Sequence, residues 1–175
     1  MFRKLRDRIS LNERENVKKN VRLYIDSFVK GCRNIDYIAI YWPLKNEVDI
    51  RSLKKKFALA LPRCKEKKEL LFYPWDEKPL TKDSEGILSP NNHFALSHKQ
   101  ISMILVPCLS VDKNLIRLGY GGGYFDKLRR DNDWRNVPCI GVLTSNCVST
   151  IPLTRADWDI PVSYTHLTLP TTTPV

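Results

Sequence analysis

Residues 37–43 read Tyr-Ile-Ala-Ile-Tyr-Trp-Pro, a continuous apolar run that a proline ends. A strand with one face in water alternates apolar and polar residues, whereas a strand covered on both faces is apolar throughout. This run shows the second pattern. We therefore expect residues 37–42 to form a strand inside a sheet that has other elements packed on both sides.

The segments around this run predict alternating helices and strands. Ser10 and Glu13 have the spacing of a capping box at a helix start, and apolar residues follow at three- and four-residue steps up to Gly31. Further strands are predicted over residues 70–73, 101–106 and 139–143, and helical segments over 49–61 and 124–130. Residues 74–92 are polar and proline-rich, which is typical of a surface excursion. The pattern predicts one domain, a three-layer α/β/α sandwich with a mainly parallel sheet.

Composition limits the classes of partner. The 175 residues suffice for one domain, and 29 Lys and Arg residues against 19 Asp and Glu residues give a net charge of +10. Such a charge favours anionic partners, which include nucleic acid, a polyanionic small molecule and a membrane surface. Charge alone does not choose among them.

The sequence also indicates a compartment. No apolar run approaches the ~20 residues of a membrane helix, and the charged N-terminus lacks the apolar core of a secretory signal. The five cysteines are an odd number without a Cys-x-x-Cys pair. We therefore expect a cytoplasmic protein without membrane contact, whose cysteines are reduced structural thiols rather than nucleophiles.

Residues 117–126 read Arg-Leu-Gly-Tyr-Gly-Gly-Gly-Tyr-Phe-Asp and hold four of the seven glycines of the chain. Glycines allow positive φ and let a ligand approach backbone N–H groups, and the helix expected next adds positive potential at its start. Arg117 adds a full charge, while Tyr120 and Tyr124 add hydroxyls or flat ring surfaces. The loop matches neither a Walker A motif nor a dinucleotide fingerprint. It predicts an anion site. A nucleotide, a sugar phosphate and a nucleic acid are all consistent with that site.

Asp126 follows the glycines in the first turn of the expected helix. A carboxylate there is suited to Mg²⁺, but it also compensates a helix dipole without any ligand. The local sequence leaves both interpretations of Asp126 open. It also leaves open that the loop is a flexible glycine-rich turn without a ligand.

The loop resembles the hallmark of the 5-formyltetrahydrofolate cyclo-ligase family, also called 5,10-methenyltetrahydrofolate synthetases, which is Arg-Leu-Gly-x-Gly-x-Gly-Tyr-Tyr-Asp. Residues 104–112 are similar to the family's approach to that loop, with Cys108 in place of the usual Gly. Residues 41–49 resemble the strand and turn whose Glu contacts folate. The resemblance spans roughly residues 12–161.

This resemblance implies an ATP- and Mg²⁺-dependent enzyme that converts 5-formyltetrahydrofolate to 5,10-methenyltetrahydrofolate with release of ADP and phosphate. The nucleotide contacts that it implies are Arg117, Leu118, Gly119, Tyr120, Gly121, Gly122, Gly123, Tyr124 and Phe125. The implied substrate contacts are Trp42, Glu47, Tyr120, Gly121, Gly122, Gly123 and Tyr124. Catalytic roles are implied for Arg117 and Tyr124, and Mg²⁺ contacts for Asp126 and Asp159.

Two alternatives remain at this point. The family begins with a helix carrying Lys-x-x-Leu-Arg that reaches ATP. Because Arg3, Lys4 and Arg6 match that motif poorly, we expect this chain to be truncated at its N-terminus by about one helical length. A catalytically impaired member that binds folate or nucleotide is therefore one alternative. A basic nucleic-acid-binding module is the other, although no RNA-binding motif supports it. We expect a monomer without specific nucleic-acid binding.

The end of the chain has a different composition. Residues 162–175 are Thr-rich and uncharged, and the first ten can be encoded by codons that resemble a transposon-based sequencing adapter. We expect residues 1–161 to form the cyclo-ligase domain and residues 162–175 to be a non-native tail.

Overall fold

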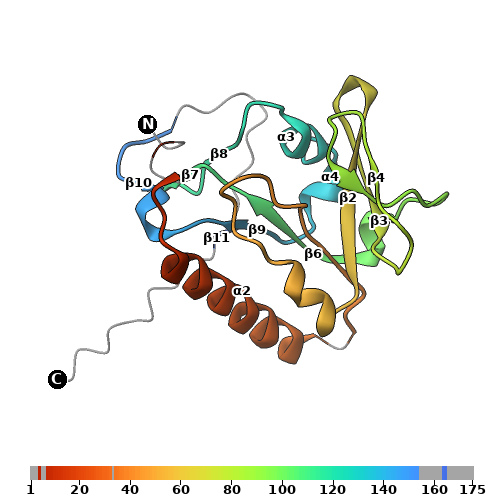
Figure 1. Ribbon diagram of the computed structural model, residues 1–175, viewed down its shortest axis with the longest axis horizontal. Helices are drawn as coiled ribbons and strands as arrows, with labels where there is room; N and C mark the ends of the chain where they lie inside the picture. Colours follow the sequence, from red (N-terminus) through yellow and green to blue (C-terminus); the bar gives the residue numbers. More distant parts are fainter. Residues whose placement is uncertain (1–3, 5–6, 33, 154–162, 165–175) are drawn as a thin grey trace.

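The computed structural model describes residues 4, 7–32, 34–153 and 163–164, and its centre is a six-stranded sheet (Figure 1). The strand order is β11–β9–β6–β1–β2–β3. The bounds are β1 Tyr37–Ala39, β2 Leu59–Lys65, β3 Glu69–Pro74, β6 Ile101–Pro107, β9 Cys139–Val142 and β11 Ser163–Tyr164. The neighbours from β11 to β2 pair in parallel, and β3 joins the edge antiparallel. The predicted mainly parallel sheet is confirmed.

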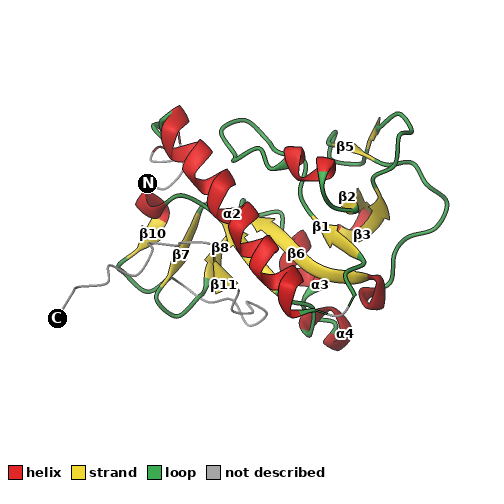
Figure 2. Cartoon of the chain, turned by 90° about the horizontal axis from the view of Figure 1, so that it is seen from below, coloured by secondary structure: helices red, strands yellow, loops and turns green. Residues whose placement is uncertain are grey.

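Helices cover both faces of the sheet. Helix α2, Leu11–Gly31, runs across one face (Figure 2) and buries Val17, Val21 and Ile25 there. The short helices α3, Tyr124–Leu128, and α4, Asn132–Arg135, pack against the other face. The three-layer α/β/α arrangement is confirmed.

Strand β1 shows why the opening run is apolar throughout. Ile38 and Ile40 pack into the core beneath α2, while Ala39 between them faces the core beneath α3 and α4. The regular strand ends at Ala39, sooner than predicted, but the Ile40 N–H still donates to the Ala60 carbonyl at 2.9 Å. Both faces of the strand are therefore buried, as its composition indicates.

The predicted start and end of α2 are also confirmed. Ser10 Oγ accepts a hydrogen bond from the Glu13 N–H at 3.2 Å, and the Ser10 N–H donates to Glu13 Oε2 at 2.9 Å. These two bonds satisfy N–H groups that no helical carbonyl reaches.

The helix predicted over residues 49–61 is wrong. Only a 3₁₀ turn, η1 Arg51–Lys55, forms there, and β2 begins at Leu59. Lys, Leu and Ala favour helices locally, but Leu59 and Ala60 pair with β1 and the following residues pair with β3. Burial between two strands outweighs the local preference.

The remaining elements are short. The excursion over residues 74–92 contains an antiparallel hairpin of β4, Thr81–Lys82, and β5, Leu88–Ser89. A separate three-stranded sheet joins β10, Val148–Ser149, to β7, Ser110–Asp112, and β8, Arg117–Leu118. The other 3₁₀ turns are η2 Glu66–Lys68, η3 His98–Gln100 and η4 Ser145–Cys147. Because β8 ends at Leu118, the glycines of the loop follow directly after the small sheet.

Strand β11 falls within residues 162–175, so two residues of the expected tail pair with β9. The division at residue 161 stays a prediction. None of the helices in the described part of the chain combines the length and the apolar character that crossing a membrane requires.

Candidate active site

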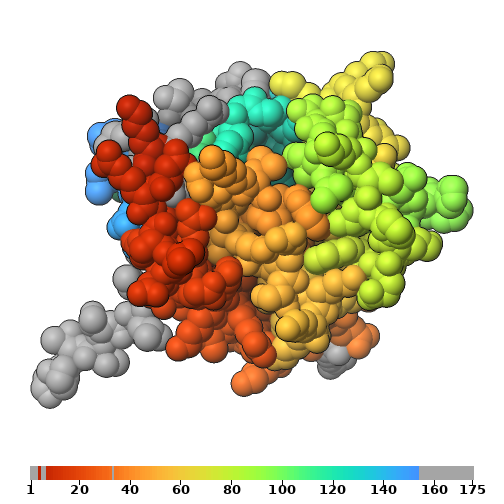
Figure 3. Space-filling model, viewed as in Figure 1, coloured from red at the N-terminus to blue at the C-terminus, as the bar shows by residue number. Residues whose placement is uncertain are grey.

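A cavity of about 120 Å³ lies where β1, β2 and β6 reach their carboxyl ends. Open α/β sheets bind ligands at this edge. The volume is below the roughly 150 Å³ that encloses a benzene ring, so a larger ligand has to lie across the cavity's open mouth. In Figure 3 the surface is hollowed between the orange segment after β1 and the teal segment of α3.

Most of the predicted site residues meet at this cavity. Those that line it are Trp42, Glu47, Arg117, Gly119, Tyr120, Gly122, Gly123, Tyr124, Phe125 and Asp126. Leu118 and Gly121 belong to the loop but are not among the lining residues. Asp159 lies outside the described residues.

Other lining residues were not predicted. They are Tyr41, Leu44, Pro62, Cys64, Leu70, Asp83, Ile87 and Pro107. Tyr41 and Pro107 lie at or just beyond the ends of predicted strands, so the strand-end rule could have indicated both. Pro62 and Cys64 lie on β2, which was predicted as helix, and no local pattern marks Asp83 or Ile87.

The glycine loop has the backbone that its composition predicts. Gly121 and Gly123 have φ of 93° and 73°, in the left-handed region that favours glycine. Within the described residues, the N–H groups of Gly121, Gly122 and Gly123 donate no hydrogen bond. The loop therefore presents backbone donors that suit an anion.

Arg117 is fixed beneath this loop, with its side chain only 8% exposed. Its Nη2 donates to Asp126 Oδ1 at 2.5 Å, and its Nη1 donates to the Pro107 carbonyl at 3.2 Å. A Cβ on Gly119 would lie 2.7 Å from Arg117 Nη1. Glycine is therefore needed at position 119 to let the guanidinium approach the backbone.

The described residues do not complete a metal site. No group of three or more His, Cys, Asp or Glu side chains able to hold a metal ion occurs among them. Asp126 does lie in the first turn of α3, as predicted, but one of its oxygens is bonded to Arg117. The role of Asp126 and Asp159 toward Mg²⁺ stays a prediction.

Tyr124 begins α3 and reaches across the cavity mouth. Its hydroxyl donates to Glu85 Oε1 at 2.5 Å, in the turn between β4 and β5. That hydrogen bond, together with burial, raises the pKa of Tyr124 to about 12. The phenol is therefore neutral at physiological pH.

The segment after β1 forms the opposite wall. The Tyr41 hydroxyl donates to the Val48 carbonyl at 2.6 Å, and Glu47 Oε2 accepts the Leu44 N–H at 2.7 Å. These bonds close the turn and hold Glu47, which is only 8% exposed, at the cavity. Arg51 lies 4.5 Å from the centre of the Trp42 ring, which limits the movement of that ring.

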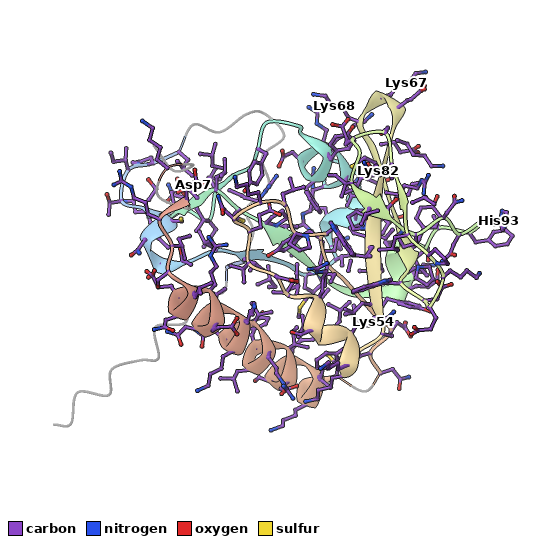
Figure 4. The ribbon with its side chains drawn as sticks, viewed as in Figure 1. Asp7, Lys54, Lys67, Lys68, Lys82 and His93 are labelled. Atoms are coloured by element: carbon purple, nitrogen blue, oxygen red, sulfur yellow. The ribbon has the colours of Figure 1, made fainter. Side chains whose placement is uncertain are left out.

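Lysines also approach the loop from the turn between β2 and β3. Lys68 Nζ lies 3.9 Å from the position that a Cβ on Gly123 would take. Figure 4 shows Lys67 and Lys68 at the end of this hairpin, and Lys127 Nζ donates to the Lys67 carbonyl at 2.6 Å. The hairpin thus adds positive charge beside the glycines.

The cysteines are free thiols, as predicted, and four of the five are buried. Cys64 lines the cavity, but burial and then the Asp83 carboxylate raise its pKa to about 12. A thiol that holds its proton this firmly is a poor nucleophile.

Comparisons with known proteins agree on one group. A sequence model of the 5-formyltetrahydrofolate cyclo-ligase family matches residues 2–166. The protein named 5-formyltetrahydrofolate cyclo-ligase from Haemophilus influenzae is 25% identical over 172 residues, covering 92% of this chain and 90% of that one. Its namesake from Mycoplasma pneumoniae is 27% identical over 137 residues, with 78% and 77% covered.

Solved structures give the same result. The 5,10-methenyltetrahydrofolate synthetase of Aquifex aeolicus has a TM-score of 0.71 and 28% identity, covering 93% of this chain and 84% of that one. The synthetase of Mycoplasma pneumoniae has a TM-score of 0.69 at 24% identity, covering 93% and 92%, and this likeness shows the fold. The family match includes the glycine loop as well as the segment that carries Trp42 and Glu47.

Proposed function

The chain belongs to the 5-formyltetrahydrofolate cyclo-ligase family, and from that premise we propose that it converts 5-formyltetrahydrofolate to 5,10-methenyltetrahydrofolate. The reaction uses ATP and releases ADP and phosphate. One observation carries the proposal: Trp42 and Glu47 after β1 and the glycine loop before α3 line the same cavity. The two halves of the site are therefore close enough to act on two substrates together.

The half formed by Trp42 and Glu47 suits the pterin ring of the folate. Trp42 offers a flat face held by Arg51, and Glu47 offers a carboxylate at the apolar cavity. A pterin carries several N–H groups around a flat ring, which a carboxylate and an aromatic face recognise together.

The half formed by the glycine loop suits the phosphates of ATP. The N–H groups of Gly121, Gly122 and Gly123 make no other hydrogen bond to described residues, and Arg117 and Lys68 lie beside them. Backbone donors and cations together hold polyphosphates without the need for a nucleophile. The residues present therefore fit a nucleotide.

The chemistry requires the formyl oxygen on N5 to become a leaving group, and bound ATP supplies the phosphoryl group that achieves this. The chain's own residues then have three tasks. Trp42 and Glu47 orient the folate, the loop and Arg117 balance charge on the transferring group, and Tyr124 limits the access of water at the cavity mouth. N10 closes the ring on the same carbon while the chain provides position and charge.

We expect turnover to require Mg²⁺, as is general for ATP-dependent phosphoryl transfer. Of the two predicted ligands, Asp126 lies within the described residues, where it accepts a hydrogen bond from Arg117. The cytoplasmic location, the monomeric state and the absence of specific nucleic-acid binding stay predictions.

The test is a turnover assay that follows the ultraviolet absorbance of the methenyl product. We expect product only when 5-formyltetrahydrofolate, ATP and Mg²⁺ are all present, with one ADP formed for each methenyltetrahydrofolate. Binding of both ligands without any product would instead indicate a catalytically impaired member of the family.

A further inference from the structure

The hydroxyl of Tyr124 is bonded to a residue far away in the sequence. Its partner Glu85 lies 39 positions earlier, in the turn that joins β4 to β5, and the two oxygens are 2.5 Å apart. Asp83 and Ile87 of the same turn line the cavity. The hairpin is therefore both a wall of the site and the support of Tyr124.

The backbone of this turn is held firmly. Asp83 Oδ1 accepts the N–H groups of Glu85 and Ile87, each at 2.9 Å. Asp83 Oδ2 accepts the Cys64 N–H of β2 at 2.8 Å, and Ser84 Oγ donates to the Cys64 carbonyl at 2.9 Å. Because the turn is bonded to the central sheet, Glu85 starts from a defined backbone position.

The ring of Tyr124 is also restricted from the opposite direction. A Cβ on Gly122 would lie 3.2 Å from Tyr124 Cδ2, so the ring lies directly over the backbone of the glycine loop. The ring is thus in contact with Gly122 at its edge and bonded to Glu85 at its hydroxyl.

We propose that Glu85 is a positioning residue, which holds the Tyr124 phenol over the glycine loop so that its ring and its oxygen lone pairs face the bound nucleotide and folate. The kinetic part of this inference rests on the proposed function. Glu85 itself need not touch either substrate, because it acts through Tyr124. The hydroxyl proton is directed to Glu85, so Tyr124 meets a ligand as a neutral acceptor rather than as an acid.

The experiment uses the full chain and three variants, Glu85→Ala, Glu85→Gln and Tyr124→Phe. The Tyr124 ring is followed at constant pH by the chemical shift of ¹³Cζ-labelled tyrosine, with Tyr124→Phe identifying its signal. We expect this signal to move in Glu85→Ala, where the hydroxyl loses its acceptor, and to move less in Glu85→Gln. We also expect Glu85→Ala to lower kcat/KM about tenfold, and Glu85→Gln to lose less because its amide oxygen still accepts the hydroxyl.

A double variant separates positioning from a general structural effect. In the Tyr124→Phe background, Glu85→Ala should have no further effect on kcat/KM, since the bond it removes is already absent. Lys127→Met is the matched control, because Lys127 joins α3 to the Lys67 carbonyl and does not touch the Tyr124 hydroxyl. It should leave the Tyr124 ¹³Cζ signal unchanged.

The inference is overturned if the wild-type protein is active and Glu85→Ala leaves both the Tyr124 ¹³Cζ signal and kcat/KM unchanged. It is also overturned if Glu85→Ala lowers kcat/KM as much in the Tyr124→Phe background as it does alone. If the wild-type protein forms no product but the Tyr124 signal moves in Glu85→Ala, the proposed function is contradicted and the Glu85–Tyr124 coupling is supported.

Discussion

The position of Arg117 depends on three of its neighbours. Asp126 and the Pro107 carbonyl accept its hydrogen bonds, and Gly119 leaves the space that its guanidinium occupies. A charged group that is so deeply buried and doubly bonded has little freedom to move aside. The absence of a side chain at position 119 is therefore as important as the bonds themselves.

Gly119→Ala tests this dependence. The added methyl group would lie 2.7 Å from Arg117 Nη1 and would force the guanidinium away from the loop. We expect kcat/KM to fall by about tenfold or more, with the free energy of unfolding changed by less than about 2 kcal/mol. Steady-state kinetics and urea denaturation measure the two effects.

Gly31→Ala is the control, because nothing lies within 4 Å of a Cβ at Gly31 on the far end of α2. It should leave turnover unchanged. Full activity in Gly119→Ala would contradict the view that Arg117 has to occupy its present position.

The contacts of Asp126 show what the sequence could not decide. From the local sequence, Asp126 suits either a metal ligand or a group that compensates a helix dipole. The structure adds a third role, the ion pair with Arg117, which joins residues nine positions apart through a loop. Such a pairing depends on the path of the glycine backbone, and no spacing rule predicts it.

At the scale of elements, the β7–β8 turn places the start of the glycine loop. Asp112 ends β7 and is 1% exposed. Its carboxylate accepts the N–H groups of Asn114 and Ile116 at 2.9 Å and that of Leu153 at 2.8 Å. One buried side chain thus fixes the turn that leads into β8 and Arg117.

Asp112→Asn should make the free energy of unfolding less dependent on pH in the acid range. Burial alone would raise the pKa of Asp112, but the three hydrogen bonds outweigh it and the pKa is lowered. The stabilisation is therefore present above the ordinary pKa of about 3.9, and it is lost as the pH falls through the lower folded value. We expect the variant to lose about 1–3 kcal/mol at pH 7.

Urea denaturation at pH 7 and below about pH 4 measures this change. The difference between wild type and Asp112→Asn should shrink at the lower pH. Asp36→Asn, at an exposed aspartate, should show no such trend. An equal loss of stability at both pH values would assign the effect of Asp112→Asn to packing instead of charge.

Elements whose signals are local were predictable, whereas those fixed by distant pairing were not. The capping box of α2 and the apolar run of β1 carry their own patterns over a few residues. Strand β2 does not, because its residues favour helix locally and become a strand only by pairing with β1 and β3. The β4–β5 hairpin was missed for a related reason, since two-residue strands leave almost no period to detect.

At the scale of the whole molecule, the cavity is assembled from the segment after β1, the strands β2, β3 and β6, the β4–β5 turn and the glycine loop. The resemblance to the cyclo-ligase family indicated the two most specific parts, namely the loop and the segment of Trp42 and Glu47. The resemblance carried no information on Glu85 or Lys68, because their roles depend on how two hairpins approach α3.

The central claim is that the two halves of one cavity serve different substrates, and the most direct test compares Glu47→Gln with Arg117→Lys. Gln keeps an oxygen for the Leu44 N–H but lacks the charge, while Lys keeps the charge but lacks the paired donors that bond Asp126 and Pro107. The measurement is the KM for each substrate at saturation with the other. We predict that Glu47→Gln raises the KM for 5-formyltetrahydrofolate about tenfold and changes the KM for ATP little. We predict that Arg117→Lys lowers kcat and raises the KM for ATP. Equal effects of both variants on both substrates, or the opposite assignment, would contradict the account.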